Sequence, residues 1–246
     1  MPTKPWSAAI PKLSKKDKIV LAIQSVAGIF LFNLLLFYGI RHTSGIEAGL
    51  ILSLSPVFVA ALSFLFLKET ITYWKSIGII LAIIGIIVIN LTGLSSFSLN
   101  PKSLGIIGNL MIVGVALCEA IFTVSGKYNT NKLSPYQISF IITLLSFVLF
   151  LPMLIYDSLK INYALIDTTV MLQMLYFIIF IGMVPYVLVY TAMKHITATA
   201  AGVLSTLIPI SGILLSIIFL GESISAKFIF GALISLTGMF ITAIFD

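Results

Sequence analysis

Residues 49–89 read GLILSLSPVFVAALSFLFLKETITYWKSIGIILAIIGIIVI, and residues 202–242 read GVLSTLIPISGILLSIIFLGESISAKFIFGALISLTGMFIT. The two stretches align without a gap when the chain is shifted by 153 positions. A proline, a glutamate and three glycines recur in this register: Gly49, Pro56, Glu69, Gly78 and Gly85 match Gly202, Pro209, Glu222, Gly231 and Gly238. Matching leucines carry little information in so apolar a chain, but these residues predict an internal duplication.

The composition of the chain is that of an integral membrane protein. Of its 246 residues, 60% are hydrophobic and 9% are charged, and the mean hydropathy is +1.18. A soluble domain carries about 25% charged residues, so this chain could not cover a water-facing surface with polar groups. The net charge of +6 comes from lysines near the ends of apolar stretches, which indicates membrane topology rather than nucleic-acid binding.

The sequence contains no motif for catalysis, metal binding or nucleotide binding. One cysteine, Cys118, and two histidines, His42 and His195, are too few for a metal site of their own. Neither a GxxxxGK[ST] loop nor an HExxH motif is present. We therefore predict no enzyme activity, no catalytic residue, no metal or other cofactor, and neither a nucleotide nor a nucleic acid as partner.

Eight apolar stretches follow a polar, basic leader at residues 1–17. Each has about 20 residues or more, enough to cross an apolar core of about 30 Å. The predicted transmembrane helices are residues 18–40, 45–67, 73–92, 103–126, 135–156, 168–192, 197–219 and 226–245. An N-terminus in the cytoplasm places ten of the fourteen positive charges on the cytoplasmic side, as membrane proteins prefer. Eight crossings return the C-terminus to the cytoplasm, and we expect a multi-pass protein of the plasma membrane.

The duplication predicts an inverted repeat. Spans one to three match spans six to eight, a displacement of five helices, and an odd displacement gives the two copies opposite orientations in the membrane. This construction is common in transporters. The expected fold is therefore all-α, a polytopic membrane protein with an inverted five-helix repeat. Residues 18–92 hold three helices of an incomplete first repeat, and residues 103–245 hold the complete second repeat.

This pattern resembles the EamA-type transporters of the drug/metabolite transporter superfamily. In that family the fourth helix of each repeat carries a mid-span proline and ends in a Leu-x-Glu-like segment before a Gly-rich fifth helix. The matching residues here are Pro56, Leu67, Glu69, Gly78 and Gly85, and Pro209, Leu220, Glu222, Gly231 and Gly238. Segments 113–127 and 181–196 look like the first and third helices of the second repeat. The resemblance covers residues 18–245 and implies ten helices, so two are expected to be missing before residue 18.

Glu119 is the strongest candidate for a solute or ion site. It lies about 10 Å from the end of its span at Gly126, and an ionised side chain at a helix centre costs about 2.5–3.5 kcal/mol. Thr123 and three glycines fall within about 40° of it on a helical wheel, so this face is expected to contact protein or a cavity. The carboxyl group is either a protonatable or cation-pairing site in the transport path, or a structural group that bonds a neighbouring helix or extends toward lipid headgroups.

Matched prolines, Pro56 and Pro209, lie near the middle of the second and seventh predicted spans. Each removes a helix hydrogen bond and frees a carbonyl group, which membrane proteins tolerate where protein or a cavity satisfies it. We interpret the two as kinks that line a central cavity, and a static kink required for packing is the alternative.

Other repeated residues point to structural roles. Glu69 and Glu222 lie at span ends, where they can satisfy free backbone N–H groups or pair with a lysine. Small-residue faces that permit close helix packing are predicted at Gly78, Gly85, Gly231 and Gly238.

Three further side chains are candidates for the solute pathway: Asn33, Tyr186 and Tyr190. Asn33 is preferred to Gln24 because nine residues of α-helix place the two about 180° apart, and Asn33 is nearer mid-span. Tyr186 and Tyr190 share a helix face, where they could stack on an organic solute or anchor the helix at the membrane interface.

Together these features predict a secondary transporter that exports small organic metabolites, such as amino acids or drug-like cations, with coupling to protons. Its expected partners are the lipid bilayer, a small organic solute and a second copy of the chain in a homodimer. The alternative is a truncated or accessory integral membrane protein without transport activity of its own, which the missing helix pair motivates.

Overall fold

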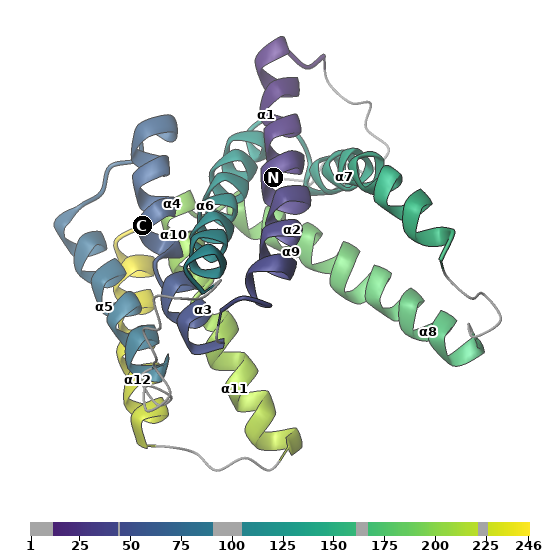
Figure 1. Ribbon diagram of the computed structural model, residues 1–246. Coiled ribbons are helices and arrows are strands. Elements are labelled where there is room, and N and C mark those ends of the chain that lie inside the picture. Colours follow the sequence, from purple (N-terminus) through teal and green to yellow (C-terminus); the bar gives the residue numbers. More distant parts are fainter. Residues whose placement is uncertain (1–11, 44, 91–104, 161–166, 221–225) are drawn as a thin grey trace. The chain divides into compact units, whose positions relative to one another are not determined.

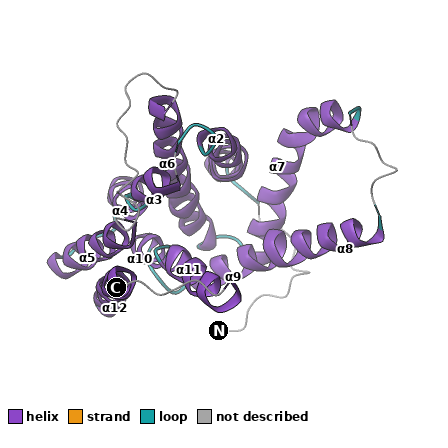
Figure 2. Ribbon diagram, turned by 60° about the horizontal axis from the view of Figure 1, so that its bottom comes forward, coloured by secondary structure: helices purple, strands orange, loops and turns teal. Residues whose placement is uncertain are grey.

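The structure, a computed structural model, describes residues 12–43, 45–90, 105–160, 167–220 and 226–246. These residues form helices joined by loops and turns, and no strand occurs among them (Figure 1; Figure 2). The α-helices are α1 (Lys15–Ser25), α2 (Phe32–Gly39), α3 (Gly45–Leu52), α4 (Ser55–Leu62), α5 (Tyr73–Asn90), α6 (Gly105–Thr130), α7 (Pro135–Ser158), α8 (Thr168–Tyr176), α9 (Val184–Met193), α10 (Ala198–Leu204), α11 (Leu207–Leu220) and α12 (Ala226–Ile244). Three π-helical segments are η1 (Val26–Leu31), η2 (Ser63–Leu67) and η5 (Phe177–Met183). The prediction of a polytopic all-α membrane protein is confirmed.

Helices lie in each of the eight ranges that the sequence predicted, within the described residues. Four helical segments, Lys15–Gly39, Ile106–Thr130, Pro135–Ser158 and Thr168–Met193, are long and apolar enough to cross a membrane. The first begins at Lys15 rather than at residue 18 because Ser14 caps it. The Ser14 hydroxyl accepts from the Asp17 backbone N–H, and the Asp17 carboxylate accepts from the Ser14 backbone N–H, which is a capping box.

The second and seventh predicted spans are each broken in two. Helix α3 ends at Leu52 and α4 begins at Ser55, while α10 ends at Leu204 and α11 begins at Leu207. Each break lies just before a proline, because proline has no N–H to donate to the carbonyl four residues earlier and its ring collides with that carbonyl. For Pro56 that carbonyl belongs to Leu52, and for Pro209 it belongs to Ser205.

The chain divides into two compact units. Unit 1 consists of Met1–Phe30 and Ser125–His195, and unit 2 consists of Leu31–Val124 and Ile196–Asp246. Unit 1 therefore holds α1, most of η1, α7, α8, η5 and α9 with the last residues of α6. Unit 2 holds the remaining helices, and with them both copies of the duplicated stretch.

Helices α5 and α12 of unit 2 lie side by side and run in opposite directions (Figure 1). A Cβ atom added at Gly78 would lie 2.7 Å from the carbonyl oxygen of Gly238, and one added at Gly85 would lie 2.5 Å from that of Gly231. Gly78 thus faces Gly238, the repeat equivalent of Gly85, and Gly85 faces Gly231, the repeat equivalent of Gly78. Crossed pairing of equivalent residues is what a two-fold axis between two copies produces; the inverted repeat itself stays a prediction.

The ends of α5 and α12 offer a test of this inversion. Stacking of Trp74 on Phe245, with ring centroids 5.2 Å apart, joins the start of α5 to the end of α12. In a Cys118→Ala background, Tyr73→Cys and Phe245→Cys should react with a membrane-impermeant maleimide from one side of sealed vesicles, and Ala226→Cys from the other. All three positions are exposed. Labelling of all three from the same side would contradict the inverted arrangement.

Candidate functional site

Glu119 of α6 lies at the break between α3 and α4 in unit 2. Its Oε2 atom accepts a hydrogen bond of 2.8 Å from the hydroxyl of Ser55, the first residue of α4. Ser55 is buried, whereas Glu119 is half-buried. The side chain of Ser205, at the matched break between α10 and α11, also interacts with the Glu119 carboxylate. One carboxylate therefore accepts a hydrogen bond at one broken helix and interacts electrostatically with a hydroxyl residue at the other.

Further buried hydroxyl groups lie at the same breaks. Ser53 and Thr206 are equivalent residues of the two copies and are 3% and 4% exposed, and Thr123, one turn beyond Glu119 on α6, is 7% exposed. The Thr206 hydroxyl donates to the carbonyl of Val203 at 2.8 Å. Oxygen atoms around one carboxylate favour a proton or a cation over an anion. Within the described ranges, no group of three or more His, Cys, Asp or Glu side chains could hold a metal ion.

The two prolines lie directly beside these breaks. Pro56 is fully buried at the second position of α4, and for Pro209 the structure describes the backbone, at the third position of α11. Their role in lining a cavity stays a prediction.

Glu69 caps the N-terminus of α10, a helix of the second repeat. Its carboxylate accepts from the backbone N–H groups of Ala198 at 2.8 Å and Thr199 at 3.1 Å, and from the Thr199 hydroxyl at 2.8 Å. The first N–H groups of a helix have no partner within the helix and carry a partial positive charge, so a carboxylate is well matched to them. Glu222, the equivalent residue, lies outside the described residues.

A partly buried ion pair lies at the start of α5. Lys75 Nζ donates to the Asp246 carboxylate at 3.0 Å, with the two side chains 5% and 11% exposed. The same carboxylate accepts from the hydroxyl and, at 2.9 Å, from the backbone N–H of Thr197. Burial alone would raise the pKa of the Asp246 carboxyl, but the hydrogen bonds from Thr197 and Lys75 outweigh burial and hold the pKa below its ordinary value of 3.8.

Asp246→Asn should therefore lower the thermal stability of the purified protein. Loss of hydrogen bonds to a charged acceptor costs about 1.5–3 kcal/mol. Because the pKa is lower in the folded state, the carboxylate stabilises the fold above about pH 3.8, and the effect is lost as the pH falls through the folded-state pKa. The difference in Tm between wild type and variant should stay constant from about pH 5 to 8 and narrow below about pH 4. A difference that does not change on acidification would contradict this assignment.

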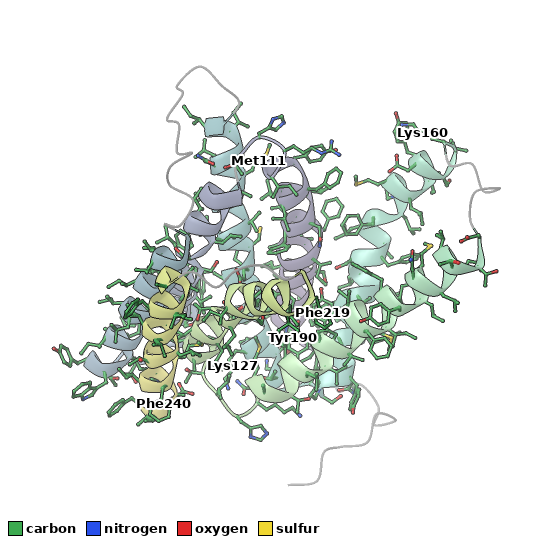
Figure 3. The ribbon with its side chains drawn as sticks, turned by 90° about the horizontal axis from the view of Figure 1, so that it is seen from below. Met111, Lys127, Lys160, Tyr190, Phe219 and Phe240 are labelled. Atoms are coloured by element: carbon green, nitrogen blue, oxygen red, sulfur yellow. The ribbon has the colours of Figure 1, made fainter. Side chains whose placement is uncertain are left out.

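In unit 1, Tyr190, which is labelled in Figure 3, belongs to a buried hydrogen-bond network. Its hydroxyl accepts from the Gln24 side-chain amide at 2.8 Å, and the Asn129 side-chain amide donates to Gln24 at 2.7 Å. Gly126 leaves room for these groups, since a Cβ atom there would lie 2.9 Å from the Tyr190 ring. The network joins α1, α6 and α9. Tyr186, one turn before Tyr190, is half-buried.

Of the two amides, Gln24 is the one that the sequence pattern ranks below Asn33, and Asn129 is not among the predicted site residues. Asn33 was preferred because a regular α-helix would separate it from Gln24 by about 180°. The segment between them, Val26–Leu31, is a π-helix, so that angle does not apply. In the structure Gln24 is fully buried and Asn33 is exposed on α2. A glutamine inside an apolar span was the available signal, because such a group needs a partner in the membrane.

Comparison with known proteins places the chain in a family. The model of the EamA-like transporter family matches residues 2–91 and 106–244. A protein described as the uncharacterized transporter YetK of Bacillus subtilis is 32% identical over 234 residues, which is 95% of this chain and 70% of that protein. An uncharacterized transporter of Methanothermobacter thermautotrophicus is 26% identical over 235 residues, which is 94% of this chain and 66% of that protein.

A solved crystal structure also has a similar fold. It matches with a TM-score of 0.71 over 92% of this chain and 79% of that chain, at 16% sequence identity. Identity this low indicates the fold alone. The family model and the two relatives carry the functional conclusion: this chain belongs to the EamA-like transporter family and is a multi-pass membrane transporter.

Proposed function

We propose that this transporter is a proton-coupled secondary exporter of small organic solutes, amino acids or drug-like cations, and that Glu119 is its proton- and cation-binding group. The observation that carries the proposal is the position of the Glu119 carboxylate, which accepts a hydrogen bond from Ser55 at one helix break and interacts with Ser205 at the matched break.

The chemistry of the carboxylate supports coupling to protons. The two ion pairs formed among the described residues are Lys75–Asp246 and Lys132–Asp17, and neither includes Glu119. An ionised carboxylate in an apolar span is costly unless a partner neutralises it. A proton or a cationic solute can neutralise the Glu119 carboxylate, and binding of one displaces the other from it. Such competition couples the movement of one to the movement of the other.

The broken helices support movement around this site. Transporters built from inverted repeats bind solutes at discontinuous helices, where backbone groups are free of the helix ladder, and expose the site to each side in turn. The crossed glycine contacts between α5 and α12 support the same inverted construction. An N-terminus in the cytoplasm of a plasma-membrane protein is part of this proposal.

Flux measurements in sealed vesicles test the proposed function. The purified chain is reconstituted, a proton gradient is imposed, and uptake of a mixed pool of amino acids and the dye ethidium is followed. We expect uptake above that of protein-free vesicles, and we expect a protonophore to abolish it. If correctly inserted protein moves no probe in response to the gradient, the proposal fails and an accessory role gains support.

A homodimer is a further part of the proposal. Helix α8 and segment η5 contain no buried residue, so they offer an apolar surface to lipid or to a second copy. The mass of the protein–detergent complex, measured by light scattering, distinguishes a dimer from a monomer.

A further inference from the structure

One end of unit 1 carries a concentration of positive charge. Seven lysines lie at the start of α1, the end of α6, the following turn and the end of α9: Lys12, Lys15, Lys16, Lys18, Lys127, Lys132 and Lys194. We call these residues the basic end. Asp17 is the acidic residue among them. The far end of α7 carries Asp157 and Lys160, about 36 Å away for a helix of 24 residues. Figure 3 labels Lys127 at the basic end and Lys160 at the far end.

Contacts between the helices hold the basic end together. The Asp17 carboxylate pairs with Lys132 and accepts from the Tyr128 hydroxyl at 3.0 Å. Lys127 Nζ donates at 2.7 Å to the carbonyl of Met193, the last residue of α9, and this places Lys194 at the same end. Two lysines are thereby occupied by protein groups.

Other lysines of the basic end are available to an outside partner. Lys15, Lys16, Lys18 and Lys194 are exposed, and neither ion pair found among the described residues includes them. Lys16 Nζ lies 5.4 Å from the centre of the Tyr128 ring, and Lys132 Nζ lies 4.8 Å from the same centre. Two ammonium groups, those of Lys16 and Lys132, therefore lie over the Tyr128 ring.

An apolar groove lies between the start of α7 and residues of η5 and α9. Its volume is about 250 Å³, and its lining residues are Tyr136 at the start of α7 and Met183, Val184, Val187 and Leu188 of η5 and α9. Tyr136 follows Lys132 by four residues, and Leu188 precedes Lys194 by six residues, about 9 Å along the chain if helical. Charge for a headgroup and an apolar surface for a hydrocarbon chain thus both occur in unit 1, a few residues apart along the chain at Lys132 and Lys194.

We infer that the basic end and this groove form a binding site for an anionic phospholipid, with the phosphate among the exposed lysines of the basic end and an acyl chain along the groove. Basic clusters at the ends of transmembrane helices attract anionic lipid headgroups, at about 1 kcal/mol per lysine. The groove favours a lipid over a soluble anion, because a soluble anion would leave the apolar lining exposed. The site is independent of Glu119 and of the proposed solute.

Native mass spectrometry of the full chain in neutral detergent tests this inference. The probes are phosphatidylglycerol, phosphatidylcholine with the same acyl chains, and soluble glycerol 1-phosphate. We expect phosphatidylglycerol to bind more tightly than phosphatidylcholine, and glycerol 1-phosphate to leave it bound. Lys16→Gln should lower the affinity for phosphatidylglycerol about fivefold. The triple variant that combines Lys16→Gln, Lys18→Gln and Lys194→Gln should lower this affinity about a hundredfold.

The matched control is Lys160→Gln, which removes an exposed lysine that also lies over a tyrosine ring, 3.7 Å from the centre of Tyr156. This variant should bind phosphatidylglycerol as the wild type does. Replacement of the same three lysines by arginine should retain binding, which separates loss of charge from misfolding. Equal affinity for both lipids, displacement by glycerol 1-phosphate, or equal effects of Lys16→Gln and Lys160→Gln would each overturn the inference.

Discussion

Glu119→Gln should reduce gradient-driven solute flux to the level of protein-free vesicles while leaving the protein inserted and folded. Glutamine has nearly the same shape and can still accept the hydrogen bond from Ser55 that the carboxylate accepts at 2.8 Å. It can neither bind a proton near neutral pH nor neutralise a cation. Transport is measured as flux in reconstituted vesicles. Folding is measured by the elution of the purified variant from a sizing column.

Two variants distinguish loss of the charge from loss of the local structure. Glu119→Asp keeps the ionisable group and should retain part of the flux. Ser55→Ala removes a hydrogen bond to a charged acceptor, worth about 1.5–3 kcal/mol, and should weaken flux without abolishing it. If Glu119→Gln transports as the wild type does, Glu119 has no part in the mechanism.

Gly85→Leu should cause the largest loss of stability in unit 2. A Cβ atom at this position would lie 2.4 Å from the backbone nitrogen of Ser235 and 2.5 Å from the carbonyl oxygen of Gly231. Both atoms belong to the backbone of α12 and cannot turn aside, so α5 and α12 would have to separate. Overpacking of this kind costs about 1–3 kcal/mol and occasionally more, and a fall in Tm of the purified protein measures it.

The repeat supplies a second variant and unit 1 supplies a control. Gly238→Leu is the equivalent change, with a Cβ atom 2.5 Å from backbone atoms of both Ala82 and Gly78, and it should destabilise to a similar extent. At Gly182 the nearest atom would be 3.7 Å away, so Gly182→Ala should leave Tm nearly unchanged. Tolerance of leucine at both α5 and α12 positions would show that the two helices do not pack as described.

The sequence predicted the helices well because apolar stretches of membrane length are a property of composition. It also located the prolines and the glycines, since a duplication marks residues that both copies need. It did not predict that α3 and α10 end before the prolines. A proline can be tolerated as a kink or can break the helix, and the choice depends on what satisfies the freed carbonyl group.

The partners of the site residues could not be predicted. Ser55 lies 64 residues from Glu119, and the helix that Glu69 caps starts 129 residues away. Such contacts depend on how helices pack, which hydrophobic periodicity does not determine. The π-helical turn at Val26–Leu31 likewise changes which face a later residue occupies, and nothing in VAGIFL marks it.

Proton release on solute binding tests the central claim, that Glu119 holds either a proton or a cation, most directly. The purified protein in weakly buffered detergent solution receives the organic cation that the flux measurement identifies, at a series of pH values from about 5 to 8. We expect release of up to one proton per bound cation from the wild type and none from Glu119→Gln. Binding without proton release across that range, or equal release from both proteins, would contradict it.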